Sequence, residues 1–493
     1  MINNIKKLKL YIKKKISGSL MDRIDLIQYI CILIAGISSS CLIYRSIQKY
    51  YNNQPIKLHS IYDKNGYIMA YNVLTYQVNI DPQKIINFDE FYEQIKHINF
   101  DKENLKKNIS QKEPFILQKD LNIKDITNIK HPAINIVKFI KRQYPLDNKF
   151  TTIGFSDLRK GIIKGIERMA ITSDVHLTID LRFQSILSDA LETIYRTKKA
   201  QFAFGLIINM DGEILGMHTT KAPSTKHPKD FFNDCFFGLY EYGSICKLFV
   251  VMAGLYYKKF EMESVIDTDE GDKLFQRKMQ DFEPIPRYSD VYTIISKSSN
   301  RGTIALQRKI GANKILKFYK KLKLNEKINI GIFTTIQPKF FNKYKEDEIY
   351  SIGFGYNFMT NAFNIIRAFL IIFNNGDIIN PTLIQENVEK RKVGKINNID
   401  YSKIISVMQR TAQRHKILAK LKCASKSGMV DRIHNGKYDK TKTNGYYICA
   451  VPDTTGKFKY LMLLCLIDPE EYDKAGVNLR ELAASIARKI YLF

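Results

Sequence analysis

The segment YEYGSICKLFVVMAGL, residues 240–255, places a serine and a lysine three positions apart at the start of an apolar run. Positions i and i+3 share one face of a helix, so Ser244 and Lys247 would point in the same direction. Burial against apolar neighbours favours a lysine that has lost its proton. A neutral amine beside a hydroxyl is a base beside a nucleophile, so this pair could support nucleophilic catalysis.

Two further short patterns follow along the chain. Ser298-Ser299-Asn300 lies in SKSSNRGT and is the only S-x-N in the sequence, and Lys426-Ser427-Gly428 lies in ASKSGMV and is the only K-[ST]-G. Each pattern alone has a structural explanation, such as a helix cap, a snorkelling lysine or a turn. Together, in this order, they resemble the set shared by penicillin-binding proteins and serine β-lactamases, which favours the chemical explanation.

Four residues of this set are predicted to be catalytic. Ser244, at the amino terminus of a helix, would lie near unpaired N–H groups that can hold an oxyanion, and Lys247 would accept its proton. Burial and a second cation, Lys426, would lower the pKa of Lys247. Ser298 would bridge the two lysines as a proton relay.

Four other residues are predicted to bind the substrate. The Asn300 amide can bind a peptide group, and Ser427 suits a carboxylate together with the neighbouring lysine. Gly428 would let the substrate lie along the strand as an added edge. The backbone N–H of Met429 would complete the oxyanion hole. This chemistry implies neither a metal nor a cofactor.

The chain after residue 23 resembles a class B penicillin-binding protein, a monofunctional peptidoglycan D,D-transpeptidase. The likeness is carried by SIYDKNGYIMA just past the apolar segment, by RQYPLDNKFTTIGFSDLRKGIIKGIE at 142–167, and by LTIDLRFQ at 177–184. The family would crosslink stem peptides that end in D-Ala-D-Ala through a serine acyl-enzyme, and it would bind penicillin and other β-lactams. FFNDCFFGLYEYGSICK and ISKSSNRGT most resemble the septal, division-specific subgroup.

The sequence departs from the family pattern at several places near its motifs. Leu58-His59 replaces an arginine-glycine pair, and Lys64 replaces the arginine of the first hallmark. Tyr242 stands where a proline is usual, Cys246 where a bulkier residue is common, and Met429 where a threonine is usual. None of these changes removes a catalytic atom, but they could alter β-lactam affinity.

Three other functions share part of this pattern. An elongation-specific class B transpeptidase has the same motifs and usually a longer pedestal. A serine β-lactamase or β-lactam sensor shares the motifs but gives no reason for the preceding domains. A non-catalytic membrane scaffold that recruits a glycan polymerase and other division proteins would have no need of the intact serine and lysines.

The run from Ile27 to Tyr44 has no charge over 18 residues, and the flank between Lys6 and Lys15 is densely basic. A bilayer span needs about 20 apolar residues, and basic flanks remain in the cytoplasm. The sequence therefore predicts an uncleaved, single-pass anchor in a bacterial inner membrane, with the catalytic domain in the periplasm. ISSSC, which ends at Cys41, only faintly resembles a lipoprotein cleavage site.

The predicted fold class is α+β: a single transmembrane helix, a β-rich pedestal, and a transpeptidase domain built on an antiparallel sheet with a helical subdomain. Turn signals at Asn65-Gly66 and Asp211-Gly212 predict hairpins. Two core strands, TNGYYICAVPD and KYLMLLCLIDP, precede a closing helix from Val477 to Lys489. The predicted domains are a cytoplasmic tail at 1–23, the anchor at 24–47, the dimerisation-type pedestal at 48–172 and the transpeptidase domain at 173–493.

The net charge of +28 raises the question of a nucleic-acid partner. The lysines are spread through every region, interleaved with Asn and Ile, and no finger, basic zipper or RNA-recognition signature accompanies them, so we expect no such partner. The seven cysteines have neither zinc-site nor disulfide-framework spacing, and we expect them to be buried and unpaired.

Overall fold

A computed structural model describes residues 58–145, 154–157, 162–220, 233–269, 281–340, 344–434, 437–471 and 474–493. Of two compact units, the larger consists of Leu58–Ser156 and Ile163–Phe493. The predicted tail and anchor, with Cys31 and Cys41, lie outside the described residues. Within the described ranges the structure contains no helix with the length and apolar character that a bilayer span requires.

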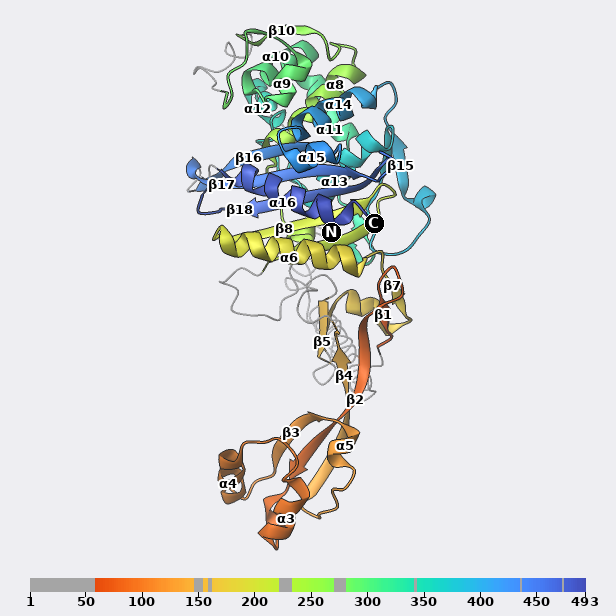
Figure 1. Ribbon diagram of the computed structural model, residues 1–493, viewed down its shortest axis with the longest axis vertical. Coiled ribbons are helices and arrows are strands. Elements are labelled where there is room, and N and C mark those ends of the chain that lie inside the picture. Colours follow the sequence, from red (N-terminus) through yellow and green to blue (C-terminus); the bar gives the residue numbers. More distant parts are fainter. Residues whose placement is uncertain are drawn as a thin grey trace, which may run out of the picture. The chain divides into compact units, whose positions relative to one another are not determined.

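The first part of the described chain is a small layer of strands and helices around one long central strand (Figure 1). The central strand β2 pairs antiparallel with β1, β3 and β4, and β1 also pairs parallel with β7. The bounds of these elements are β1 Ile61–Tyr62, β2 Ile68–Ile80, α3 Phe88–Ile95, α4 Lys102–Ser110, β3 Phe115–Leu121, α5 Ile123–Ile126, β4 Ile134–Gln143 and β7 Val175–His176.

Apolar side chains from β2 and from α3 form the core of this layer. Val78 and Ile80 of β2 pack with Phe91 and Ile95 of α3, all of them at most 1% exposed. Alternate residues of a strand face one side, so β2 can bury this row against the helix. The sequence predicted only the first hairpin here, and that hairpin is confirmed: Gly66, at φ +84°, lies in the turn between β1 and β2.

The second part is built on a five-stranded antiparallel sheet in the order β16-β17-β18-β8-β9. The predicted hairpin about Asp211-Gly212 and the two predicted terminal strands are confirmed. The strand that the sequence analysis expected at Gly428 is β16, and it forms one edge of the sheet. The bounds are β8 Phe202–Asn209, β9 Ile214–Thr219, β16 Ala424–His434, β17 Lys437–Pro452 and β18 Phe458–Ile467.

Helices fill much of the chain between β9 and β16, as the sequence predicted, and two more flank the sheet. Their bounds are α6 Leu181–Thr197, α7 Asp234–Phe237, α8 Lys247–Tyr256, α9 Val291–Ser296, α10 Asn300–Ile310, α11 Ala312–Lys321, α12 Glu346–Ile352, α13 Ala362–Phe373, α14 Tyr401–Ala412, α15 Lys416–Lys420 and α16 Ala475–Ile490. Short two-stranded ladders lie between them or follow the pedestal: β5 Gly154–Asp157 with β6 Ile162–Gly165, β10 Val265–Asp267 with β11 Tyr288–Asp290, β12 Asn329–Ile330 with β13 Phe333–Thr334, and β14 Asp377–Ile379 with β15 Lys392–Lys395.

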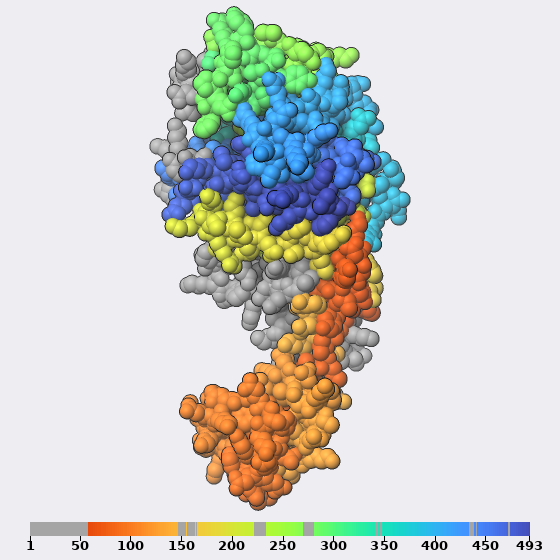
Figure 2. Space-filling view, viewed as in Figure 1, coloured from red at the N-terminus to blue at the C-terminus, as the bar shows by residue number. Residues whose placement is uncertain are grey.

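The helices α6 and α16 share one hydrophobic core with the sheet. Leu187 of α6 and Leu479 of α16 are fully buried in it, together with Met462 and Leu464 of β18. The surfaces of the two helices adjoin in the space-filling view (Figure 2). The predicted closing helix is therefore confirmed, and it supports the sheet that carries the third sequence motif.

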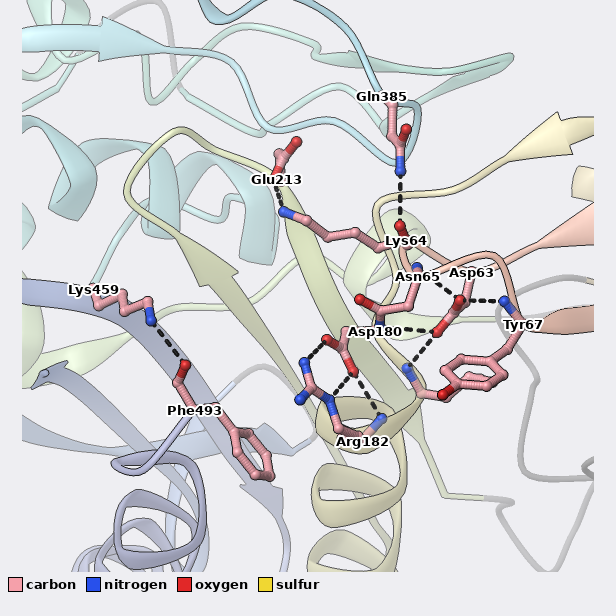
Figure 3. Close-up of polar contacts among 11 residues, drawn as sticks. Asp63, Lys64, Asn65, Tyr67, Asp180, Arg182, Glu213, Gln385, Lys459 and Phe493 are labelled. Atoms are coloured by element: carbon pink, nitrogen blue, oxygen red, sulfur yellow. Dashed lines mark hydrogen bonds and ion pairs between the residues drawn. The ribbon is translucent and has the colours of Figure 1, made fainter.

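The turn of the first hairpin contacts the start of α6 (Figure 3). The fully buried Asp63 carboxylate accepts hydrogen bonds from the backbone N–H groups of Asn65 and Tyr67 at 2.8 Å each, and from Leu181 N at 3.2 Å. A carboxylate is stabilised at a helix amino terminus by the free N–H groups there. Lys64, which replaces the arginine of the family hallmark, forms an ion pair with Glu213.

A buried ion pair joins two segments of the family resemblance. Arg142 of β4 donates from Nε to the Glu167 carboxylate at 3.1 Å, and the two side chains are 1% and 0% exposed. Burial raises the pKa of Glu167, while the neighbouring guanidinium lowers it. The pair therefore links the strand that closes the pedestal to the segment that leads into the second domain.

Replacing Arg142 with Met should destabilise the protein, because it leaves the Glu167 carboxylate buried without its cation. We expect the free energy of unfolding to fall by about 3–5 kcal/mol near neutral pH. The loss should be smaller at acidic pH, where the carboxyl can bind a proton instead.

Denaturant unfolding, followed by tyrosine fluorescence, measures the change. The matched control is Lys141→Met, which removes the neighbouring, partly exposed pair with Asp120 and should cost less than about 1 kcal/mol. Equal denaturant midpoints for the two variants would show that the buried pair stabilises the protein no more than the partly exposed pair does.

Candidate active site

Ser244 lies in a 3-10 turn, Gly243–Cys246, that leads directly into α8. Residues three apart eclipse one another in such a turn, so Ser244 and Lys247 share a face as predicted. The turn requires glycine: Gly243 has φ +60°, and a Cβ there would lie 2.5 Å from the Met429 carbonyl oxygen. Ser244 is half-buried, whereas its neighbours Gly243 and Ile245 are buried.

Lys247 begins an almost wholly buried helix and is itself 0% exposed. Its ammonium group compensates for lost water with three hydrogen bonds: to Ser298 O at 2.5 Å, to Asn300 Oδ1 at 2.7 Å and to Ser298 Oγ at 3.4 Å. A buried polar group needs such partners. The apolar run therefore tolerates a lysine because the turn between α9 and α10 supplies the acceptors.

The third motif brings a second lysine into contact with Ser298. Lys426, on β16 and 1% exposed, donates from Nζ to Ser298 Oγ at 2.9 Å and to Ser427 O at 3.1 Å. The Ser298 hydroxyl thus lies between the two ammonium groups. The structure brings Lys247, Ser298 and Lys426 into contact, from α8, the α9–α10 turn and β16, and Ser244 lies one turn before Lys247.

Both lysines have a reduced affinity for protons. Burial lowers the pKa of Lys247 far below its usual range, and Lys426 lowers it further, while Asp281 raises it. Burial lowers the pKa of Lys426 to about 7, with a smaller contribution from Arg414 in the same direction. Because the two amines interact, the loss of a proton from one affects the pKa of the other.

The edge strand β16 approaches the nucleophile turn closely. A Cβ on Gly428 would lie 2.6 Å from Tyr242 O, so this glycine is needed for contact within the protein. Ser427 and Met429 lie on the other side of the strand: the Met429 sulfur would be 3.4 Å from a Cβ on Gly476, at the start of α16. Since β16 pairs only with β17 among the described strands, its other edge can accept a substrate backbone.

The predicted substrate-binding roles stay predictions, although Gly428 and Met429 meet the turn of Ser244 and Asn300 contacts Lys247. The Asn300 oxygen accepts from Lys247, which leaves its amide NH₂ to meet a peptide carbonyl. Tyr242, in place of the usual proline, is fully buried and packs on Tyr446 with ring centroids 4.7 Å apart. Cys246 is fully buried, and the five described cysteines are free.

Several residues that shape the site carried no motif. Gly355, at φ +89°, packs its backbone against Gly243: a Cβ on Gly355 would lie 2.2 Å from Gly243 O. Asp281, Glu283 and Arg414 surround the lysines with charge. The G-x-G of the segment GFGYN could have indicated a tight backbone contact, but nothing in the spacing of the charged residues points to the site.

Residues 203–491 match the family described as penicillin binding protein transpeptidase domain, and residues 60–154 match the penicillin-binding protein dimerisation domain. The chain belongs to the penicillin-binding protein family. A dimerisation domain ahead of the transpeptidase domain is the organisation of class B within it.

Similar proteins agree with this assignment. The chain is 24% identical over 350 residues to "Probable peptidoglycan D,D-transpeptidase FtsI" of Caulobacter vibrioides, covering 64% of this chain and 58% of that protein. It is 23% identical over 421 residues to "Peptidoglycan D,D-transpeptidase FtsI" of Buchnera aphidicola, covering 74% and 71%. A peptidoglycan synthetase structure from Bifidobacterium adolescentis shares the fold, with TM-score 0.65 and 16% identity over 88% of this chain and 95% of that one.

The depressed pKa of Lys426 should make stability depend on pH. Between about 7 and the ordinary value of 10.5, the unfolded chain binds a proton at this site that the folded chain does not. The free energy of unfolding should therefore rise with pH, by at most about 1.4 kcal/mol per pH unit from this group.

Unfolding of the wild type and of Lys426→Met at several pH values above 7 tests this. The difference between them should shift in favour of the wild type as pH rises. Lys457→Met, which replaces an exposed lysine, should follow the wild type. Parallel curves for the wild type and Lys426→Met would mean that Lys426 keeps an ordinary affinity for protons.

Proposed function

We propose that the protein is a peptidoglycan D,D-transpeptidase that acts on stem peptides ending in D-Ala-D-Ala. One observation carries the proposal: the Ser298 hydroxyl lies 3.4 Å from Lys247 Nζ and 2.9 Å from Lys426 Nζ, beside the turn of Ser244. These contacts support a base and a proton route for Ser244 as the nucleophile, as serine acyl transfer requires. The names of the relatives describe the same reaction.

In the first half-reaction, Ser244 Oγ forms an ester with the carbonyl carbon of the penultimate D-alanine, and Lys247 accepts the hydroxyl proton. The amide bond to the terminal D-alanine breaks, and the leaving amine gains a proton by way of Ser298. The N–H groups of Ser244 and Met429 are the donors proposed for the oxyanion. Ser427 and Lys426 would hold the terminal carboxylate, and Asn300 a peptide group.

In the second half-reaction, the amine of a neighbouring stem forms an amide with the same carbonyl carbon. The ester bond breaks, and the proton that the amine loses returns to Ser244 Oγ through Lys247. The product is a crosslink between two stems. The free edge of β16 would align the donor stem during both steps.

The proposed setting is the septum of a dividing bacterium. Relatives named FtsI support the division-specific subgroup that the nucleophile segment resembles. The uncharged run at Ile27–Tyr44, with its basic flank, supports an anchor in the inner membrane and a catalytic domain in the periplasm. The anchor and pedestal would contact a membrane glycan polymerase and other division proteins.

Covalent labelling with a fluorescent penicillin tests the reaction. We expect the purified protein to form a lasting adduct that Ser244→Ala does not form. The matched control is Ser264→Ala, which replaces a serine on a turn outside the three motifs and should label normally. A folded wild type that stays unlabelled would contradict the proposal and favour a scaffold, whereas rapid drug turnover would favour a β-lactamase.

Depletion of the protein in its host tests the septal role. Cells that lose a septal transpeptidase should keep elongating without dividing and so form filaments. Expression of the wild type should restore division, and expression of Ser244→Ala should not. Rounded cells after depletion would point to the elongation-specific role, and rescue by Ser244→Ala would point to the scaffold.

A further inference from the structure

One carboxylate outside the sequence motifs is hydrogen-bonded to the turn that carries Ser298. Asp281 accepts from Ser299 Oγ at 2.5 Å, from Asn300 N at 2.5 Å and from Arg301 N at 3.2 Å. These groups open the 11-residue helix α10, whose first N–H groups have no partner within the helix. Asp281 therefore binds the helix start from outside.

The turn that Asp281 holds is unusual in its backbone. Ser298 has φ +57°, a left-handed conformation that non-glycine residues adopt only when their surroundings fix it. Both the carbonyl and the hydroxyl of Ser298 contact Lys247, as does the Asn300 oxygen. A small rotation of the turn would therefore move three of the contacts on which the base depends.

Each of the two lysines is influenced by one acidic group, which raises its pKa, and by one cation, which lowers it. Asp281 acts on Lys247, and Lys426 opposes it. On the other side, Glu283 acts on Lys426, and Arg414 opposes it. Two further described charges near this turn have partners of their own: Lys297 contacts Glu283 at 2.9 Å, and Arg301 contacts Asp269. Asp281 is thus the acid that raises the pKa of Lys247, the proposed base.

We propose that Asp281 is a positioning residue of the active site, which holds the Ser298–Asn300 turn in its left-handed conformation and supplies the counter-charge for Lys247. The inference rests on the proposed transpeptidase function, because it assigns Lys247 the role of base. Asp281 acts through the turn that it holds and through its charge.

The two parts of this role predict different effects. Loss of the hydrogen bonds should slow acylation at every pH, by about 10- to 100-fold if the turn shifts. Loss of the negative charge should act on the pH profile. Without Asp281 the pKa of Lys247 falls further, so the amine is neutral at lower pH and the acidic limb of the acylation rate moves to lower pH.

The experiment measures the rate of acylation of the full-length protein by a fluorescent penicillin across a range of pH. Asp281→Asn keeps the size of the side chain and removes its charge, whereas Asp281→Glu keeps the charge. The matched control is Asp290→Asn, because Asp290 caps the neighbouring helix α9 through Thr293 N at 2.7 Å. Thermal unfolding shows that each variant is folded.

We expect Asp281→Asn to react slowly and to shift the acidic limb, Asp281→Glu to keep the wild-type limb, and Asp290→Asn to match the wild type in both respects. If Asp281→Asn is unfolded, Ser299→Ala removes one hydrogen bond to the carboxylate and should slow acylation with the acidic limb of the pH profile unchanged.

Slow acylation of Asp281→Asn with an unmoved acidic limb would overturn the role of Asp281 as counter-charge, and wild-type kinetics of this variant would overturn the whole inference. A folded wild type that never labels would instead overturn the proposed function, and this inference with it.

Discussion

The structure depends on two lysine side chains that are both buried against one serine hydroxyl. The charged forms of the two amines that share the Ser298 oxygen repel each other, and burial deprives both of water, so each lysine loses its proton more readily. The fold offsets this cost in two ways. Oxygens of Ser298 and Asn300 accept hydrogen bonds from Lys247, and the carboxylates of Asp281 and Glu283 lie nearby. The partners are 51 and 128 residues apart in sequence, so the helices and the sheet must be in place before the site exists.

The sheet that carries Lys426 is supported by two helices that share its hydrophobic core. Helix α6 packs on the sheet together with α16, and its first turn receives the buried carboxylate of Asp63 from the first hairpin. The same hairpin contacts Glu213, which lies in the turn before β9. The hallmark segment of the family therefore connects the first hairpin to α6 and to the turn before β9. Lys64, in place of arginine, can serve this purpose because it keeps an acidic partner, Glu213.

Sequence patterns predicted the parts of the fold that have strong local signals. Asn65-Gly66 and Asp211-Gly212 indicated their hairpins, and the apolar runs of β17 and β18 indicated strands. The pedestal strands β3 and β4 were missed, because most of their residues are exposed or half-buried and their partner β2 is remote in sequence. The motifs located Ser244, Lys247, Ser298 and Lys426, but not Asp281, since a carboxylate that meets a turn through tertiary packing has no characteristic spacing.

The glycines of the site have a consequence for the evolution of drug resistance. Gly243, Gly428 and Gly355 meet neighbouring backbone so closely that a Cβ at each would lie 2.2 to 2.6 Å from a carbonyl oxygen. A side chain at Gly243 or Gly428 would push the nucleophile turn away from the strand, and one at Gly355 would push it away from the loop of Gly355. We therefore expect substitutions that change β-lactam affinity to avoid these three glycines and to occur at neighbours such as Met429, whose side chain faces α16 and leaves the backbone contacts unchanged.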